Sequence, residues 1–374
     1  MSRSIAIIGG GPAGAVCALK LAQGGARVWL FERDPQREKP CGGGLTERAL
    51  RVLPELRGWD LPWLPVRKLS FVSHSGRMTT LEPDEPVHVL PRVELDGALR
   101  RKAVEAGAEL IAESVDELQP RPGGGWTVNG RSVEILVGAG GMNCPVAKRQ
   151  GLLLPNASRA IAVGRWVPGQ YPPHIICRFF PEFSGYTWWF PRREHASLGI
   201  EMPAAFFQTD RAWALLKFFA ERNLPGIEVS AGEAYGWTGP IISDQQWAER
   251  RLCGTDWLVV GDAAGLVDGT TGEGISYALA SGRFAAEAIL AGNLAGYEKR
   301  LRESLISELA KSARLAKKFY IPWLSRLAVF GLSRSGTARA IACEVAHGRQ
   351  SYLTLKDRVY KILPRLVYEI LADK

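Results

Sequence analysis

The pattern of apolar and polar residues predicts a strand, a helix and a second strand within the first 34 residues. The apolar run Ile5–Ile8 leads into a glycine-rich turn, and a helical pattern follows from about Ala13 to Gln23. A second apolar run from Arg27 to Phe31 predicts the next strand, after Gly24 and Gly25 end the helix. We expect the rest of the chain to be arranged around this βαβ unit.

The pattern changes several times further along the chain. We expect strands within residues 66–90, a helix from Pro91 to near Gly107, strands at 109–113 and 133–137, a strand-rich aromatic stretch over 160–203, a helix from Thr209 to Arg222, strands over 227–234 and 234–239, a buried strand over 257–260, a long helix after Gly274, and mainly helices from residue 296 onward. No internal repeat interrupts this order.

Length and cysteine usage limit the class of protein. A chain of 374 residues can bury a large core, and it contains no apolar run of membrane-spanning length. Because the first strand begins at Ser4, we expect no signal peptide and a cytoplasmic location. The six cysteines are scattered without a C-x-x-C pair, which argues against a zinc site and a disulfide framework.

The net charge of +9 is concentrated at the C-terminal end. Residues 296–374 hold 16 Lys and Arg against 7 Asp and Glu, whereas residues 1–295 hold 31 of each kind. Such a region can attract an anionic membrane surface at the periphery, or an anionic lipid substrate, although a solvated helical cap would have the same composition. Nucleic-acid binding is not expected, because no nucleic-acid motif accompanies the charge.

The glycines of the first turn indicate dinucleotide binding. Gly9, Gly11 and Gly14 fit G-x-G-x-x-G, with Ala13 before the third glycine. These glycines permit the tight turn, the approach of a pyrophosphate and close helix packing, and the helix N-terminus attracts the phosphate. Glu32, followed by Arg33, lies about twenty residues beyond, where a carboxylate can bind an adenosine ribose. This stretch alone leaves FAD and NAD both open.

A loop beyond the second strand resembles a known family. The sequence Pro40-Cys41-Gly42-Gly43-Gly44 is similar to a loop of the geranylgeranyl reductase family of flavoproteins. In that family the loop runs beside the flavin ring, and its cysteine has been implicated in activity. The three glycines would allow a backbone to lie against a flat ligand. A flexible loop with an incidental cysteine is the alternative.

An aromatic motif extends the resemblance. Tyr186, Trp188, Phe190 and Pro191 match the Y-x-W-x-F-P sequence that lines the cavity over the flavin in geranylgeranyl reductases. Alternation places the three aromatic residues on one face of a strand, as a wall for a long apolar substrate, although many such stripes are simply core. Flavin-dependent halogenases carry a similar W-x-W-x-I-P sequence, so this motif does not separate the two families.

Two further segments favour FAD over NAD. Gly261 and Asp262 follow a buried strand and resemble the flavin signature whose aspartate holds a ribityl hydroxyl group. Gly272, Gly274 and Ile275 start a long helix whose N-terminus can stabilise negative charge on a reduced flavin.

One further position agrees with the family and two depart from it. Arg92, in an R-x-x-L-D sequence, corresponds to an arginine that reaches the cofactor in related flavoproteins, although an arginine at a helix start can also be simply solvated. The chain departs from the family where Gly140 replaces an aspartate and Gly269 replaces a proline.

The resemblance implies a fold like that of para-hydroxybenzoate hydroxylase. We expect an α/β, Rossmann-type FAD-binding domain from residues 1–65, 92–150 and 250–295, an antiparallel-sheet substrate domain from 66–91 and 151–249, and a basic helical C-terminal region over 296–374. Because no second glycine fingerprint is visible, NAD(P)H or ferredoxin would visit the flavin transiently as electron donor.

The activity that the resemblance implies is reduction of carbon–carbon double bonds in a polyprenyl (geranylgeranyl) chain of an isoprenoid lipid. Reduced FAD would transfer hydride to one carbon, and Cys41 or Tyr186 would supply the proton. A flavin-dependent monooxygenase or halogenase acting on an aromatic or lipid substrate is the alternative, although no catalytic lysine can be placed. A non-catalytic protein that carries flavin or lipid is a third possibility.

Overall fold

A five-stranded parallel sheet joins strands that are far apart in the sequence, in a computed structural model that describes residues 3–73 and 75–372. The strands, in spatial order, are β18 (Trp257–Val259), β12 (Ile135–Gly138), β1 (Ser4–Ile8), β2 (Arg27–Phe31) and β8 (Glu109–Ile111). The register places Ile7 beside Val137 and Val137 beside Leu258. These strands are almost wholly apolar because both faces of the sheet are covered.

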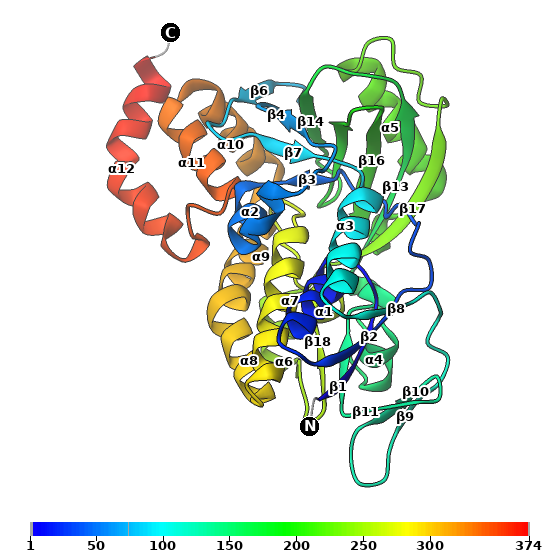
Figure 1. Ribbon diagram of the computed structural model, residues 1–374. Coiled ribbons are helices and arrows are strands. Elements are labelled where there is room, and N and C mark those ends of the chain that lie inside the picture. The colour runs from blue at the N-terminus through cyan, green and yellow to red at the C-terminus, as the bar shows by residue number, and fades with distance from the viewer. Residues whose placement is uncertain (1–2, 74, 373–374) are drawn as a thin grey trace.

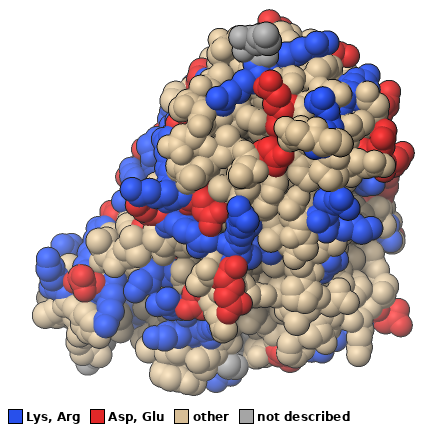
Figure 2. Space-filling view, turned by 90° about the horizontal axis from the view of Figure 1, so that it is seen from below, with Lys and Arg blue, Asp and Glu red and all other residues tan. Residues whose placement is uncertain are grey.

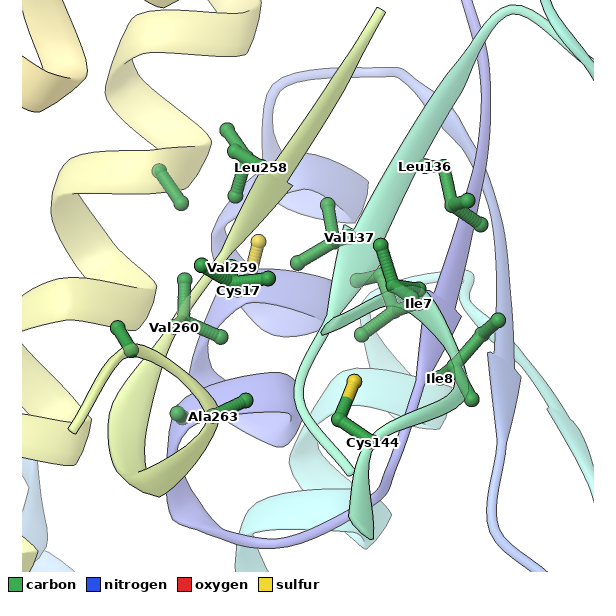
Figure 3. Packing of buried hydrophobic residues seen from close by; sticks show 14 of the residues in the cluster. Ile7, Ile8, Cys17, Leu136, Val137, Cys144, Leu258, Val259, Val260 and Ala263 are labelled. Carbon is green, nitrogen blue, oxygen red and sulfur yellow. The ribbon is translucent and has the colours of Figure 1, made fainter. Parts of the chain in front are cut away.

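Helices α1 (Pro12–Gln23), α3 (Arg92–Glu105) and α7 (Ile275–Leu290) form the layer beside this sheet (Figure 1). A Cβ atom at Gly282 of α7 would lie 2.2 Å from the carbonyl oxygen of Ala13, so the missing side chain permits the close contact between α1 and α7. Figure 3 shows the core between these elements, where Cys17 of α1 lies near Val137 and Val259 of the sheet. The first βαβ unit is therefore the centre of the parallel half of the molecule.

A seven-stranded sheet forms the second half, and it is antiparallel except where β14 and β5 run parallel. Its strands in spatial order are β17 (Glu233–Pro240), β13 (Arg159–Pro168), β16 (His195–Pro203), β15 (Tyr186–Pro191), β14 (His174–Phe179), β5 (Lys68–Val72) and β6 (Met78–Leu81). Helix α5 (Thr209–Asn223) covers one face (Figure 1). Thus residues 66–91 and 151–249 supply this sheet, while 1–65, 92–150 and 250–295 supply the parallel one; their division into substrate and cofactor domains stays a prediction.

Smaller elements complete the fold. These are the antiparallel sheet of β9 (Leu118–Pro120), β10 (Trp126–Val128) and β11 (Arg131–Val133), the sheet of β3 (Gly44–Leu45), β7 (Val87–Val89) and β4 (Leu64–Val66), and the short helices α2 (Glu47–Val52), α4 (Pro145–Arg149) and α6 (Asp244–Glu249). Strand β3 continues the glycine loop that begins at Cys41, so this loop is anchored by pairing with β7.

The C-terminal region is helical, as expected. Its helices are α8 (Leu294–Leu301), α9 (Ser307–Phe319), α10 (Pro322–Arg334), α11 (Gly336–Ala346) and α12 (Tyr352–Ala372), with a π-helical stretch over Arg302–Ile306. Figure 1 shows α10–α12 beside the β6 edge of the seven-stranded sheet, and α10 contacts β6. None of the described helices combines the length and the apolar composition needed to cross a bilayer.

One expected strand is wrong. Residues 227–232 form turns, and strand β17 begins only at Glu233. Pro225 and Gly226 follow helix α5 and stop it from continuing. Gly232 adopts φ +144°, and a Cβ added there would lie 2.1 Å from the Trp166 carbonyl oxygen. The apolar residues of this segment pack beneath the sheet from a turn instead of extending it.

Candidate active site

The predicted dinucleotide turn lies between β1 and α1, at the carboxyl end of the parallel strands. A Cβ atom at Gly14 would lie 2.0 Å from the Gly9 carbonyl oxygen, so this glycine is required for close packing. At Gly11 an added Cβ would meet no atom within 4 Å. This free space lies at the N-terminus of α1, whose cap residue is Gly11 itself. The turn therefore fits a pyrophosphate approaching the backbone there.

Glu32 follows β2 beside this turn, and backbone hydrogen bonds orient its carboxylate. One oxygen accepts a hydrogen bond from the Gly10 N–H at 2.8 Å and the other from the Asp34 N–H at 3.2 Å. A carboxylate has lone pairs for further donors, so Glu32 can also accept from ribose hydroxyl groups. Arg100 of α3, which sequence reasoning missed, donates to the Gly10 carbonyl at 2.9 Å, while Arg33 is exposed.

Asp262 lies in the short helical turn Gly261–Ala264 that follows β18. Its carboxylate forms an ion pair with the ammonium group of Lys39 at 2.8 Å. Burial alone would raise the pKa of Asp262, but the positive charges of Lys39 and Arg92 outweigh it and hold the pKa below its usual value. Gly261 adopts φ +58° and approaches Ala13, so the two glycine signatures meet in space.

The Cys41–Gly44 loop lies against an aromatic side chain. A Cβ at Gly42 would lie 2.9 Å from the Phe190 ring, and a Cβ at Gly44 would lie 3.0 Å from it. The Cys41 side chain is half-buried, and its Sγ accepts a hydrogen bond from the Gly43 N–H at 3.3 Å. The glycines thus bring the predicted cysteine loop into contact with the predicted aromatic wall.

Buried arginines hold this loop in place. Arg192, which follows the aromatic motif directly, donates to the Cys41 carbonyl oxygen and forms an ion pair with Glu38, both at 2.8 Å. Glu38 also accepts from the backbone N–H groups of Arg92 and Val93. The sequence analysis missed Arg192 and Glu38. The only feature that could have indicated them is that each is a charged residue next to a motif.

Arg92 is buried. An arginine that only stood at the start of a solvated helix would be exposed. Its guanidinium group binds the carboxylate of Asp96 through two hydrogen bonds of 3.0 and 2.8 Å. Burial acts against its charge, but the adjacent Asp96 carboxylate more than compensates and raises the pKa of Arg92. The predicted contact of Arg92 with the cofactor stays a prediction.

One face of the seven-stranded sheet is aromatic. Tyr186, Trp188 and Phe190 share this face, as alternation predicts, while Trp189 packs into the opposite face beneath α5. Pro191 ends the strand and is buried. Phe179, a cross-strand neighbour of Tyr186, contacts Phe319 and Tyr320 at the end of α9, with ring centroids 4.9 and 6.1 Å apart. The C-terminal helices therefore lie against the aromatic face.

Tyr186 joins this face to the turn before α7. Its hydroxyl donates to the Thr271 carbonyl at 3.4 Å, and a Cβ at Gly272 would lie 2.5 Å from the Tyr186 oxygen. Gly272 also adopts φ +71°, a conformation that favours glycine. Burial raises the pKa of Tyr186 well above its usual value, so its phenol stays protonated at neutral pH.

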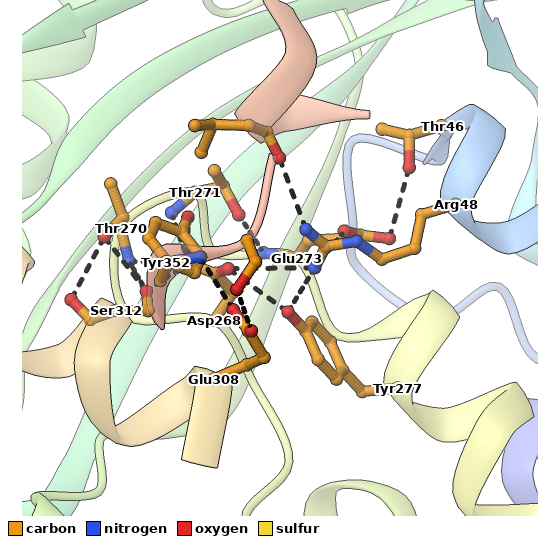
Figure 4. A network of polar contacts seen from close by, with 12 residues as sticks. Thr46, Arg48, Asp268, Thr270, Thr271, Glu273, Tyr277, Glu308, Ser312 and Tyr352 are labelled. Carbon is orange, nitrogen blue, oxygen red and sulfur yellow. Dashed lines mark hydrogen bonds and ion pairs between the residues drawn. The ribbon is translucent and has the colours of Figure 1, made fainter. Parts of the chain in front are cut away.

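A polar network fixes the segment from Asp268 to Gly274, which leads to Ile275 at the start of α7 (Figure 4). The buried Asp268 accepts hydrogen bonds from the hydroxyl groups of Ser312 in α9 at 2.5 Å and Tyr352 in α12 at 3.2 Å. Arg48 of α2 forms an ion pair with Glu273 at 3.6 Å. The C-terminal helices thus support a turn that the sequence predicts to bind the cofactor.

The structure brings most of the predicted site residues together. The glycine turn, Glu32, Asp262 and the start of α7 lie at one edge of the parallel sheet, with the Cys41 loop and the aromatic face beside them. Gly140 lies beside the glycine turn, since a Cβ at Gly9 would lie 2.8 Å from the Gly140 nitrogen, while a Cβ at Gly140 itself would lie 3.0 Å from the Cys144 Cα.

Comparison with known proteins supports this assembly. The FAD binding domain family matches residues 2–164. Geranylgeranyl diphosphate reductase of Oryza sativa is 31% identical, over 83% of this chain and 71% of that protein. Digeranylgeranylglycerophospholipid reductase 2 of Methanothermobacter thermautotrophicus is also 31% identical, over 85% of this chain and 88% of that protein.

Solved structures share the fold. A geranylgeranyl bacteriochlorophyll reductase-like protein of Thermoplasma acidophilum superposes with a TM-score of 0.77 at 21% identity, covering 95% of this chain and 99% of that one. A flavin-dependent brominase superposes with a TM-score of 0.73 at 19% identity, covering 98% and 100%. Structural likeness at this identity establishes the fold alone, whereas the sequence relatives identify the family. The chain belongs to the geranylgeranyl reductase family of FAD-dependent oxidoreductases.

Proposed function

We propose that this protein reduces carbon–carbon double bonds in a geranylgeranyl or other polyprenyl chain. The observation that carries the proposal is the contact of Tyr186 with Gly272, which places an aromatic face directly beside the predicted flavin-binding turn. The names of two relatives, reductases of geranylgeranyl diphosphate and of a digeranylgeranyl phospholipid, support the same substrate class. FAD would supply a hydride when reduced, and NAD(P)H or ferredoxin would be the transient electron donor.

The residues around the site have separate tasks in this proposal. The aromatic side chains of Tyr186, Trp188 and Phe190 would bind the polyprenyl chain and exclude water from it. The N-terminus of α7 would stabilise negative charge on the reduced flavin. Lys39 would keep Asp262 ionised, as an acceptor for hydroxyl groups of the cofactor. Cys41 and Tyr186 are the proton donors that the family resemblance suggests, and burial keeps the Tyr186 phenol protonated at neutral pH.

The test uses the purified FAD-containing protein, reduced chemically without oxygen. Addition of geranylgeranyl diphosphate should reoxidise the flavin, and the product should gain two hydrogens per reduced double bond by mass. Flavin that stays reduced until oxygen is admitted would instead favour a monooxygenase or halogenase. Flavin that is never reoxidised by a substrate would favour a non-catalytic carrier.

Cys41 can be tested in the same assay. If Cys41 is the proton donor, Cys41→Ala should keep its FAD absorbance but lose most of its reoxidation rate, whereas Cys343→Ala, in α11, should keep both. Unchanged reoxidation in Cys41→Ala would remove Cys41 from the mechanism.

We also propose that the C-terminal helices contact an anionic membrane surface. Helix α12 exposes large apolar residues at helical spacing, with exposed fractions of 62% for Tyr360, 46% for Val367 and 69% for Leu371. Lysine and arginine side chains gather over the same part of the molecule, at the left of Figure 2. An apolar stripe flanked by positive charge is typical of helices that lie in a bilayer interface.

A further inference from the structure

A carboxyl group that no motif predicts lies on the aromatic face. Glu201 is in β16, directly opposite Tyr186 of β15, so both side chains project from the same face of the sheet. On its other side Glu201 pairs with the small Ala162 of β13, and its Oε2 lies 3.8 Å from the position of a Cβ at Gly239 in β17. The small residues leave room for a carboxyl group in the middle of the sheet.

Glu201 lies between the predicted cofactor residues and the predicted substrate face. Its neighbours that carry titratable groups are Tyr186 from β15, Asp262 from the turn after β18 and Tyr320 from the end of α9. Lys39 is already paired with Asp262. Among the residues that the structure describes, no side chain forms an ion pair or hydrogen bond with the Glu201 carboxyl group, so nothing holds it in the ionised form.

We propose that Glu201 is the acid that supplies the proton when the double bond is reduced; this role rests on the reductase function proposed above. One carbon of the double bond accepts the hydride of the reduced flavin, and the other carbon accepts the proton. The O–H bond of Glu201 breaks as the new C–H bond forms, which leaves Glu201 as a carboxylate. Water then returns a proton to it, and the flavin is left oxidised.

Electrostatics agree with this assignment. Burial, assisted by the negative charge of Asp262, raises the pKa of Glu201 from 4.5 to about 7. An acid with a pKa near the working pH can donate a proton and recover it readily. The pKa of Tyr186 is raised and that of Asp262 is lowered, so these neighbours keep one protonation state at neutral pH. His195 is on the same face but at the opposite end of β16, against Arg192.

The first test measures protonation without turnover. In the folded protein Glu201 keeps a proton that the unfolded chain has already lost between pH 4.5 and 7. Its stabilising contribution is therefore present at low pH and is lost as the pH rises towards 7. Melting temperatures of FAD-loaded wild type and Glu201→Gln should agree at pH 5 and diverge by pH 8, with the variant more stable. A difference that does not change with pH would contradict the proposal.

The second test measures the proton transfer itself. In anaerobic reoxidation with geranylgeranyl diphosphate, Glu201→Gln should slow the reaction about 10²-fold or more while keeping its FAD absorbance. The wild-type rate should fall as pH rises through about 7, and Glu201→Asp should restore part of the rate. Glu233→Gln is the matched control, because Glu233 is on the same sheet face but exposed at the end of β17.

The outcomes separate the two proposals. If wild type and Glu201→Gln reoxidise at equal rates with the polyprenyl substrate, the role of Glu201 is overturned and the reductase function stands. Wild-type protein that never reduces a polyprenyl substrate would overturn the function, and the role of Glu201 with it.

Discussion

Neighbouring glycines in the first turn act differently because their missing side chains face different surroundings. At Gly14 an added methyl group would overlap the carbonyl oxygen of Gly9, so this glycine serves the packing of the turn itself. At Gly11 a methyl group would enter free space at the N-terminus of α1. The same motif thus contains one glycine that packing requires and one whose side-chain position is open, where we propose that the pyrophosphate binds.

A matched pair of variants separates these roles. Gly14→Ala should lower the free energy of unfolding of the FAD-free protein by about 1–3 kcal/mol, because the turn must shift. Gly11→Ala should change it by less than about 1 kcal/mol, the size of a capping effect, but should weaken FAD binding by blocking the pyrophosphate. Denaturant unfolding and flavin titration measure the two quantities. Wild-type affinity for FAD in Gly11→Ala would show that no phosphate approaches there.

The ion pair of Arg92 and Asp96 is a second residue-scale prediction. Both side chains are buried, so removing the carboxylate leaves an unpaired guanidinium group in the interior. Asp96→Ala should therefore destabilise the protein by about 3–5 kcal/mol. Glu105→Ala in the same helix breaks an exposed pair with Lys102 and should cost at most about 1 kcal/mol. Equal losses in the two variants, measured by denaturant unfolding, would contradict this reading of burial.

At the scale of elements, one buried carboxylate connects the C-terminal helices to the turn before α7. Asp268 is the shared acceptor, since Ser312 of α9 and Tyr352 of α12 both donate to its carboxylate. A change in these helices should therefore reach the turn that contains Gly272, although they are far apart in the sequence.

Tyr352→Phe tests this connection. Loss of one buried hydrogen bond to a charged acceptor should lower the free energy of unfolding by about 1.5–3 kcal/mol. Hydrogen exchange should become faster in residues 268–274 and in the first turn of α12, because the two are held by the same carboxylate. Tyr360→Phe, in the exposed part of α12, is the control. Faster exchange in α12 alone would show that the turn does not depend on the hydrogen bond from Tyr352.

At the scale of the whole molecule, the charge surplus and the exposed apolar stripe of α12 occupy the same end (Figures 1 and 2). The rest of the chain carries no surplus, since residues 1–295 hold 31 basic and 31 acidic side chains. This asymmetry would orient the protein with its C-terminal helices towards an anionic surface.

Vesicle sedimentation tests the proposed orientation. The protein should bind vesicles containing phosphatidylserine more than neutral phosphatidylcholine vesicles, and binding should weaken as salt increases. Val367→Ser combined with Leu371→Ser should reduce binding, whereas Val104→Ser, an exposed apolar site on α3, should not. Equal binding to both vesicle types would contradict a charge-dependent contact. A dimer in sedimentation velocity that the double substitution dissociates would identify the stripe as an interface between two copies.

The amino-acid sequence by itself determined the elements and signatures whose causes are local. Strands β1 and β2 and helix α1 begin and end within about one residue of the predicted limits, because apolar periodicity and glycine act over short distances. Alternation likewise placed Tyr186, Trp188 and Phe190 on one face. Of the strand expected over 227–234, only Glu233 and Ala234 lie in a strand, because the positive φ of Gly232 and its close approach to Trp166 interrupt the extended pattern.

Only the tertiary structure decided which charged groups meet at the site. Glu201 faces Tyr186 through the register of two strands, Arg192 reaches Cys41 across 151 positions, and Asp268 meets Tyr352 across 84. Glu201, Arg192 and Asp268 carry no local pattern, since burial and charge pairing depend on segments that become neighbours only on folding. The sequence therefore identified the flavin-binding signatures, while the fold selected Glu201 as the carboxyl group between them and the aromatic face.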